Sequence, residues 1–198
     1  MKKKIPIGSG LGGGSSNAAT TLVALNYLCK IHFSSNFLEK IGANLGCDIP
    51  LFIRGHTSFG EGKGDRLKPF CLLKTKWYLI LYPNIQISTK EIFQEYSIKN
   101  HNKSFSSLSS LFNKPFKNDC EEIVRKKYSL INKLFLWLSQ YATPNLTGTG
   151  SCVFAIFNKK KHAENVLLLI PKWTEGFISK GINASPLKKL CNSQKNTF

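Results

Sequence analysis

The sequence predicts an α+β protein. Three observations support this class: a glycine-rich segment that runs directly into an amphipathic helix, short apolar runs that end at proline or glycine, and several segments of helical spacing in the second half of the chain. With 198 residues, 42% of them hydrophobic, the chain can form a packed core in one or two small domains. This composition excludes wholesale disorder.

The spacing of apolar residues predicts each element in turn. Helices are expected over residues 17–29, 37–45, 89–96, 119–127, 130–141 and 160–170. Strands are expected over residues 49–53, 57–59, 77–82, 145–146, 152–157 and 176–182, with a weaker one at 2–7. The stretch 100–113 is rich in serine and asparagine and is expected to be mainly loop.

Within the first two helices, the spacing also predicts which side chains face the core. Ser15 or Ser16 is the expected N-cap of the first helix, and Gly46 is the expected end of the second. The side chains expected to point inward are Ala18, Leu22, Leu25 and Leu28 from the first helix, and Phe37, Leu38, Ile41 and Leu45 from the second.

The chain is strongly basic, with a net charge of +17. A basic surface attracts phosphate, which raises the possibility of nucleic-acid binding. However, only Arg54, Arg66 and Arg125 are arginines, and the remaining basic residues are lysines scattered along the chain. Arginine is the usual residue for reading bases and for gripping phosphate bidentately. We therefore expect no nucleic-acid binding beyond non-specific charge attraction. An AT-rich genome, which favours Lys, Asn, Ile and Phe, is an alternative source of the charge.

Cysteine spacing and hydropathy indicate a cytoplasmic protein. The six cysteines include no closely spaced pair, and the four histidines have no metal-ligand spacing with them, so reduced thiols are expected. The apolar run 166–170 is far shorter than a membrane span, and the lysines at 2–4 are followed by glycines in place of a signal peptide's apolar region. No membrane partner is expected, and the predicted state is a monomer or a weak homodimer.

The segment 8–14 contains five glycines, followed by Ser15, Ser16 and the first helix. Glycines allow backbone N–H groups to approach a ligand closely, and a helix start adds unpaired N–H groups and a positive dipole end. The segment therefore predicts a cradle for a di- or triphosphate. It lacks the lysine of a Walker loop, and its match to the dinucleotide pattern G-x-G-x-x-G is weak without a good preceding strand. A flexible linker is the structural alternative.

Four stretches together resemble the GHMP kinase family, which includes galactokinase, homoserine kinase and mevalonate kinase. They are Pro6-Ile7-Gly8-Ser9-Gly10-Leu11-Gly12-Gly13-Gly14-Ser15-Ser16-Asn17-Ala18-Ala19-Thr20, Leu45-Gly46-Cys47-Asp48-Ile49-Pro50, Leu146-Thr147-Gly148-Thr149-Gly150-Ser151-Cys152-Val153-Phe154 and Lys180-Gly181-Ile182-Asn183-Ala184-Ser185-Pro186-Leu187. The resemblance extends from Ile5 to about Leu190 and is strongest to the branch that phosphorylates a cytidine diphosphate-linked methylerythritol in isoprenoid biosynthesis.

The resemblance implies a two-domain GHMP kinase fold. Residues 1–68 would be the remainder of a truncated, ribosomal-protein-S5-like nucleotide-binding domain, and residues 69–198 a ferredoxin-like α/β-plait substrate domain. The implied activity is ATP-dependent phosphorylation of the acceptor's 2-hydroxyl. The implied ATP-binding residues are Pro6, Ile7, Gly8, Ser9, Gly10, Leu11, Gly12, Gly13, Gly14, Ser15 and Ser16, the last two also assisting Mg²⁺.

The resemblance also implies roles for residues outside the first glycine segment. Asp48 would be the catalytic base beside the accepting hydroxyl, although from the sequence alone it reads as a turn or cap aspartate. Thr147–Gly150, otherwise a tight hairpin turn, would lie against the nucleotide loop and stabilise it. Thr89 would contact substrate, although a helix-capping threonine is the simpler interpretation. Glu61, the other nearby acid, is expected to be a solvated loop residue.

The chain departs from the family at its beginning. Members carry further strands before the glycine segment, with an early lysine, aromatic residues and a histidine that this sequence does not match. A misassigned start, a decaying gene or a second chain supplying the remainder would each account for this. We expect exposed apolar surface and an open strand edge where those strands would pack. The alternative functions are an inactive kinase fragment, a GHMP kinase with another acceptor, and a basic RNA-binding module.

Overall fold

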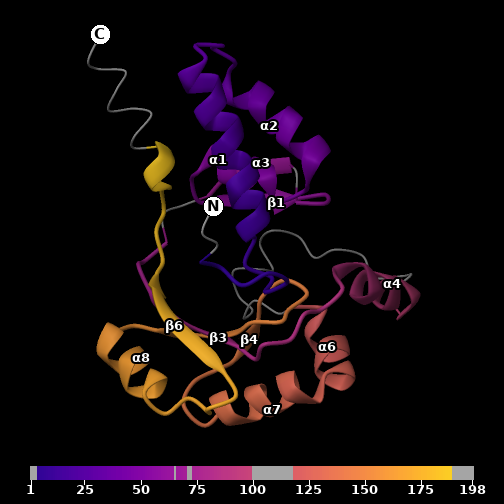
Figure 1. The fold of residues 1–198 in the computed structure, drawn as a ribbon, viewed down its shortest axis with the longest axis vertical. Helices are drawn as coiled ribbons and strands as arrows, with labels where there is room; N and C mark the ends of the chain where they lie inside the picture. The colour runs from indigo at the N-terminus through magenta and orange to yellow at the C-terminus, as the bar shows by residue number, and fades with distance from the viewer. Residues whose placement is uncertain (1–3, 65, 71–72, 100–117, 189–198) are drawn as a thin grey trace. The chain divides into compact units, whose positions relative to one another are not determined.

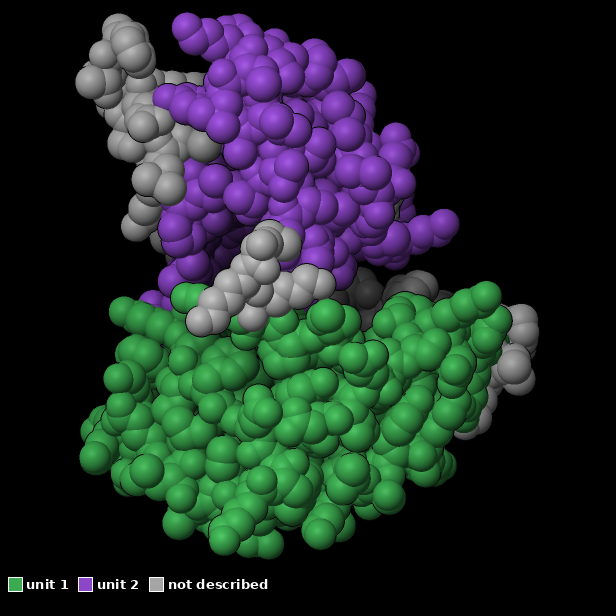
Figure 2. All heavy atoms as spheres, viewed as in Figure 1, with its two compact units in different colours: residues 1–11, 76–180 green, residues 12–75, 181–198 purple. Residues whose placement is uncertain are grey.

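A computed structural model describes residues 4–64, 66–70, 73–99 and 118–188. The chain divides into two compact units that are interleaved along the sequence (Figure 2). Unit 1 comprises residues 1–11 and 76–180, and unit 2 comprises residues 12–75 and 181–198. The family domains predicted at 1–68 and 69–198 remain a prediction, because compact units defined by contacts need not coincide with family domains.

Unit 1 is built on a four-stranded antiparallel sheet in the order β4-β5-β3-β6. The strands are β3 (Trp77–Tyr82), β4 (Asn145–Leu146), β5 (Val153–Phe157) and β6 (Glu175–Lys180). Helices α4 (Thr89–Lys99), α6 (Glu121–Lys127) and α7 (Ser129–Leu138) connect β3 to β4, and α8 (Lys160–Leu167) connects β5 to β6. This βαββαβ order is that of the ferredoxin-like fold, so the fold predicted for the second domain is confirmed.

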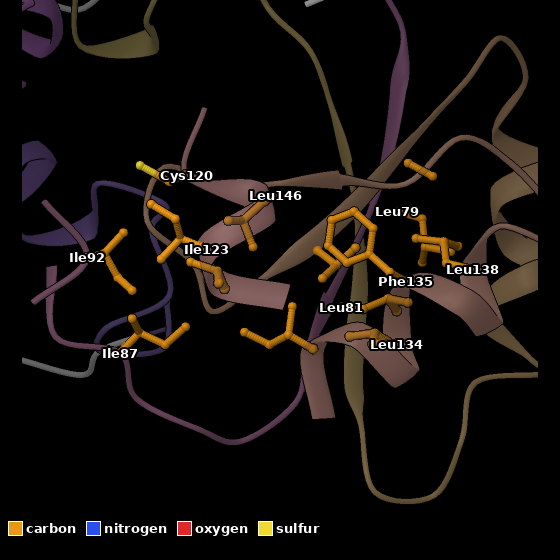
Figure 3. Close-up of a cluster of buried hydrophobic side chains, with 14 of the residues drawn as sticks. Leu79, Leu81, Ile87, Ile92, Cys120, Ile123, Leu134, Phe135, Leu138 and Leu146 are labelled. Atoms are coloured by element: carbon orange, nitrogen blue, oxygen red, sulfur yellow. The ribbon is translucent and has the colours of Figure 1, made fainter. Parts of the chain in front are cut away.

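Helices α6, α7 and α8 lie along one side of this sheet (Figure 1). Leu79 and Leu81 alternate along β3 with Tyr78 and Ile80, so one set points towards the helices and the other away from them. Phe135 of α7 joins Leu79 and Leu81 in one buried cluster (Figure 3). This cluster is the main core among the described residues, and it lies entirely in unit 1.

Unit 2 combines three helices with a two-stranded antiparallel sheet. The helices are α1 (Gly13–Leu28), α2 (Ser35–Leu45) and α3 (Ile49–Arg54), and the strands are β1 (Ser58–Glu61) and β2 (Arg66–Pro69). Its core contains Ala19, Leu38, Ile49 and Ile53. A Cβ at Gly42 would lie 2.7 Å from Ile53 Cδ1 and 2.8 Å from Ile49 Cγ2, so glycine lets α2 and α3 pack closely.

Two local predictions in unit 2 were wrong. The run 49–53 is helix α3 and not a strand, because a short apolar run fits either element and here Pro50 stands at the start of a helix that Gly55 ends with φ 63°. The first helix begins at Gly13 with Gly12 as its N-cap, so Ser15 and Ser16 lie inside the first turn. The weak strand expected at 2–7 is also absent from its described part, residues 4–7. Strand β2 was not predicted, and most of its residues are exposed.

The remaining predicted elements are confirmed with shifted ends, apart from residues 100–113, which lie outside the described part of the chain. The inward face of the first two helices is only partly confirmed. Leu38 is buried, whereas four side chains expected inside are exposed, namely Leu25, Leu28, Phe37 and Leu45. The last turns of α1 and α2 therefore carry large apolar side chains on the surface.

Unit 2 has exposed apolar side chains and strands without further partners among the described residues, and whether they mark where further strands would pack stays a prediction. In addition to the four side chains above, Tyr27, Ile31, Phe33 and Leu51 of unit 2 are exposed. Within the described residues, β1 and β2 pair with each other and with no further strand. Among the described residues, the outer edges of both strands therefore have no partner strand.

Candidate nucleotide-binding site

The first half of the glycine-rich segment is fixed by the second glycine loop. Both belong to unit 1. The backbone N–H groups of Ser151 and Cys152 donate to the carbonyl oxygens of Gly8 (3.1 Å) and Ser9 (3.2 Å), and Thr147 Oγ1 donates to Ser9 O at 2.6 Å. Ser9 itself is 3% exposed. The predicted contact between the two loops is therefore confirmed, and Thr147–Gly150 also forms the turn between β4 and β5.

Glycine is required at position 10 for two reasons. Gly10 has φ +71°, a conformation that other residues rarely adopt. A Cβ there would lie 2.2 Å from Thr147 O and 2.7 Å from Gly150 O. Gly8 and Gly12 also have positive φ, of 68° and 67°. Alternation of left-handed and ordinary residues turns successive N–H groups towards one side, which is the geometry of an anion-binding nest.

The second half of the segment is the start of α1, in unit 2. Its N-cap, Gly12, has no side chain, and no acidic residue lies in the first turn. Ser16 N–H donates to Gly12 O at 2.8 Å, which is the first bond of the helix. The N–H groups of Gly13, Gly14 and Ser15 therefore have no carbonyl of the helix to bind. An anion at this end would be stabilised by those donors and by the helix dipole.

Asp48 occupies the N-cap position of α3, but its carboxylate makes no capping hydrogen bond. The residue is exposed, and its side chain has no hydrogen bond or ion pair with any described residue. Phe52 lies four residues further along, on the same face of α3. The Phe52 ring approaches Gly12, where a Cβ would lie 2.9 Å from Phe52 Cζ. Phe52 of α3 thus lies against the start of α1.

Two other predicted residues lie as follows. Thr89, at the start of α4, shares a hydrogen bond with Thr149 of the second glycine loop, with 3.0 Å between the hydroxyl oxygens. Glu61 lies in β1 and accepts a hydrogen bond from Lys68 Nζ at 2.7 Å, so it is held in a cross-strand ion pair. The loop position expected for Glu61 is therefore wrong, because the residue lies in β1 and is paired with Lys68 of β2. Of the two carboxylates, Asp48 is the one without a described partner.

Sequence reasoning missed Asn118, which precedes α6. Its amide nitrogen donates to Leu146 O (3.0 Å) and Gly148 O (2.6 Å), and its Oδ1 accepts from Cys120 N–H (2.9 Å). The only sequence signal was an asparagine just before a predicted helix, which is common in turns that bind no loop.

The described residues contain no group of three or more His, Cys, Asp or Glu side chains that could hold a metal ion. The hydroxyls of Ser15 and Ser16 are the oxygen donors that the first turn of α1 offers. Mg²⁺ commonly keeps several waters and takes phosphate oxygens with one or two protein ligands, so these hydroxyls fit a Mg²⁺ ion that is bound to nucleotide phosphates. The described helices also include none long and apolar enough to span a membrane.

Two family models match the sequence. "GHMP kinases N terminal domain" matches residues 1–56, and "GHMP kinases C terminal" matches residues 93–172. Together they cover more than half of the chain in the order expected for one protein. The chain belongs to the GHMP kinase family.

The chain is also similar to individual members of this family. The chain is 46% identical over 187 residues to a 4-diphosphocytidyl-2-C-methyl-D-erythritol kinase of Tolumonas auensis, which is 94% of this chain and 65% of that protein. A crystal structure of 4-(cytidine 5'-diphospho)-2C-methyl-D-erythritol kinase matches with a TM-score of 0.75 at 24% identity, over 90% of this chain and 68% of that one. A homoserine kinase from Cytophaga hutchinsonii matches with a TM-score of 0.59 at 16% identity, over 92% of this chain and 69% of that one. These two structural matches establish the fold. The chain spans about two thirds of the length of each of these relatives.

Proposed function

We propose that this chain binds ATP and transfers its γ-phosphoryl group to the 2-hydroxyl of 4-diphosphocytidyl-2-C-methyl-D-erythritol, a step of isoprenoid biosynthesis. The observation that carries the proposal is the glycine-rich segment 6–16, which combines alternating positive φ with an uncapped helix start. The acceptor is taken from the relative that is 46% identical. Because the chain spans 65% of that relative, the activity is a proposal for this chain.

In this proposal the phosphates are held by backbone donors. The N–H groups of Gly13, Gly14 and Ser15 face an anion at the start of α1, and the glycines allow close approach. Residues 6–11 precede this helix start in the chain, and Gly8 and Ser9 are fixed within unit 1 through their carbonyl oxygens. Mg²⁺ would arrive with the nucleotide and neutralise phosphate charge, with Ser15 or Ser16 supplying a hydroxyl ligand.

Asp48 is the proposed general base. As the acceptor's oxygen attacks the γ-phosphorus, the bond between that phosphorus and the β–γ bridging oxygen breaks, and ADP leaves. The proton of the hydroxyl passes to the Asp48 carboxylate. This carboxylate has no hydrogen bond or ion pair with a described residue. Thr89, bonded to Thr149, is the proposed acceptor contact on the α4 side.

The test is a comparison of two carboxylate-to-amide substitutions. Asp48→Asn should lower turnover about 10²–10⁴-fold with ATP affinity retained, because the phosphates contact the backbone and not the carboxylate. Glu61→Gln is the matched control, because Glu61 forms an ion pair with Lys68 and has no proposed role in catalysis. Product formation by ³¹P NMR and ATP binding by calorimetry measure the two effects. Near-normal turnover in Asp48→Asn would sink the assignment of the base.

Acceptor profiling distinguishes this proposal from a GHMP kinase with another acceptor. RNA binding is distinguished by salt, because charge-driven binding falls steeply with ionic strength and ATP would not compete for it. A cytoplasmic location and a monomer or weak homodimer complete the proposal. The free thiols of the described cysteines support a reducing compartment.

A further inference from the structure

Asn118 forms three hydrogen bonds around the second glycine loop, and none of its donors is left for a ligand. Both hydrogens of its side-chain amide are used, towards Leu146 O at 3.0 Å and Gly148 O at 2.6 Å. Its carbonyl oxygen accepts from the backbone of Cys120. The residue is half-buried. Its hydrogen bonds connect the chain before α6 to Leu146, just before the second glycine loop, and to Gly148 within that loop.

The loop that Asn118 holds is the support of the first glycine-rich segment. Thr147, between the two bonded carbonyls, donates to Ser9 O at 2.6 Å and to Cys152 O at 2.9 Å. Ser151, at the far end of the loop, donates through its backbone to Gly8 O and through its hydroxyl to Ile85 O at 2.6 Å. A shift of the loop would therefore be transmitted directly to Gly8 and Ser9.

The same loop also contacts the proposed acceptor side. Thr149 shares its hydroxyl hydrogen bond with Thr89 and is 7% exposed. A single four-residue turn thus contacts the nucleotide segment through Thr147 and the acceptor residue through Thr149. Both contacts depend on the position of this turn. Within the described residues, Asn118 is the side chain from outside the loop that donates to the carbonyl oxygen of Gly148 and to that of Leu146 just before the loop.

We propose that Asn118 is a positioning residue for nucleotide binding, which acts by fixing Thr147–Gly150 against residues 8–9. This inference rests on the proposed function for its effect on ATP, but its structural part does not. The decisive chemistry is the pair of amide donors. Aspartate has the same shape but no donor when ionised, and it would place negative charge against two carbonyl oxygens. It would still accept from Cys120 N–H, so the turn before α6 is retained.

The experiment compares Asn118→Asp with Asn132→Asp in the full chain. Asn132 lies in α7 of the same unit and accepts from Arg125 Nε at 3.1 Å, a bond that aspartate preserves. Both variants change charge equally. Hydrogen exchange at the Ser151 and Cys152 amides, which donate to Gly8 and Ser9, reads the loop without any ligand. ATP affinity, the KM for ATP and kcat read the consequence for function.

Asn118→Asp should accelerate exchange at those two amides and weaken ATP binding about tenfold, the scale of one lost hydrogen bond to a positioned group. The KM for ATP should rise more than kcat falls, since Asn118 does not touch the reacting atoms. Asn132→Asp should match the wild type in each measurement. Asn118→Ala, which removes the donors without adding charge, should show the same pattern and replaces Asn118→Asp if that variant does not fold.

Unchanged exchange at Ser151 and Cys152 would overturn the inference. Faster exchange throughout unit 1 would overturn it as well, because Asn118 would then stabilise the fold in general. If the wild type binds no ATP, the proposed function fails, while the exchange measurement still decides whether Asn118 fixes the loop.

Discussion

The two units of this protein are stabilised in different ways. Among the described residues, unit 1 contains a continuous core of sixteen buried residues, most of them on its sheet and on helices α6, α7 and α8. Unit 2 contains four such residues, and much of its apolar surface remains exposed. Hydrogen bonds and ion pairs form a larger share of the stabilising contacts in unit 2. Arg54 donates to both carboxylate oxygens of Glu39 and to Leu67 O, and Asn183 holds Thr57 and the backbone of Leu73.

The proposed nucleotide segment belongs to both units. The chain passes from unit 1 to unit 2 between Leu11 and Gly12, within the run of glycines. The part in unit 1 is fixed by hydrogen bonds to the second glycine loop, whereas the part in unit 2 is the start of a helix. Substitutions in the two parts should therefore differ in their effect on stability.

The largest stability effect is expected in the core of unit 1. Phe135→Ala should lower the free energy of unfolding by about 3–5 kcal/mol, because a fully enclosed ring leaves a cavity. Ile53→Ala in unit 2 should cost less, about 2 kcal/mol, since a small core with exposed neighbours can relax around the gap.

Tryptophan fluorescence separates the two units in denaturant unfolding. Trp77, Trp137 and Trp173 are the three tryptophans of the chain, and all belong to unit 1. Phe135→Ala should shift the fluorescence transition, and Ile53→Ala should shift mainly the circular-dichroism transition. Equal shifts of both transitions in both variants would contradict independent stabilisation of the units.

The next effect concerns two glycines of the proposed nucleotide segment. Gly10→Ala should destabilise by more than about 2 kcal/mol, because positive φ and a clash with two carbonyl oxygens act together. Gly14→Ala places its Cβ in open space inside α1 and should be neutral or stabilise by up to about 1 kcal/mol. Thermal unfolding measures both, and a destabilised Gly14→Ala variant would contradict the packing described for α1.

A smaller effect is expected for the Arg54 tie. Arg54→Lys keeps the charge but loses the two-pronged contact with Glu39, so unit 2 should lose about 1–2 kcal/mol. Lys126→Ala removes an exposed ion pair with Glu122 and should change stability by less than about 0.5 kcal/mol. Denaturant titration gives both values. If the two substitutions cost the same, polar ties do not have the role in unit 2 that we assign to them.

The smallest effect on stability is expected for the thiols. Their rate of chemical labelling should nevertheless differ strongly between the two units. Cys29 and Cys47 of unit 2 are exposed, whereas Cys120 and Cys152 of unit 1 are buried. Iodoacetamide at pH 8 should label the first two rapidly and the other two only after unfolding. Site-resolved mass spectrometry reads the order, and rapid labelling of Cys152 in the folded protein would contradict the closed loop contact at Ser9.

The Cys152 thiol also predicts a pH dependence. Burial raises the pKa of Cys152 to about 12. Because the unfolded thiol ionises near pH 8.5, the folded protein loses stability as the pH rises from about that value towards 12, and it is unaffected below. Cys152→Ala should reduce this loss in unfolding experiments at pH 8 and pH 10. An identical loss in both proteins would assign the pH dependence to other groups.

Most of the fold could be predicted because its signals are local. Trp77–Tyr82 is an apolar run that ends at Pro83, and it is the central strand β3 as expected. The run 49–53 could not be assigned to strand or helix from periodicity alone, although Pro50 and Gly55 were usable signals for a helix. The contact of Thr147 with Ser9 joins residues 138 positions apart, so only the family resemblance predicted it. Asn118 lies outside every motif and required the structure.

The most direct test of the nucleotide site is amide NMR of the ¹⁵N-labelled chain titrated with MgATP. The largest shifts should fall on the backbone N–H groups of Gly8–Ser16, with saturation at one nucleotide per chain and little loss of affinity at higher salt. Shifts spread over the lysine-rich surface, weakening steeply with salt, would show that ATP binds by charge alone and would contradict a backbone cradle.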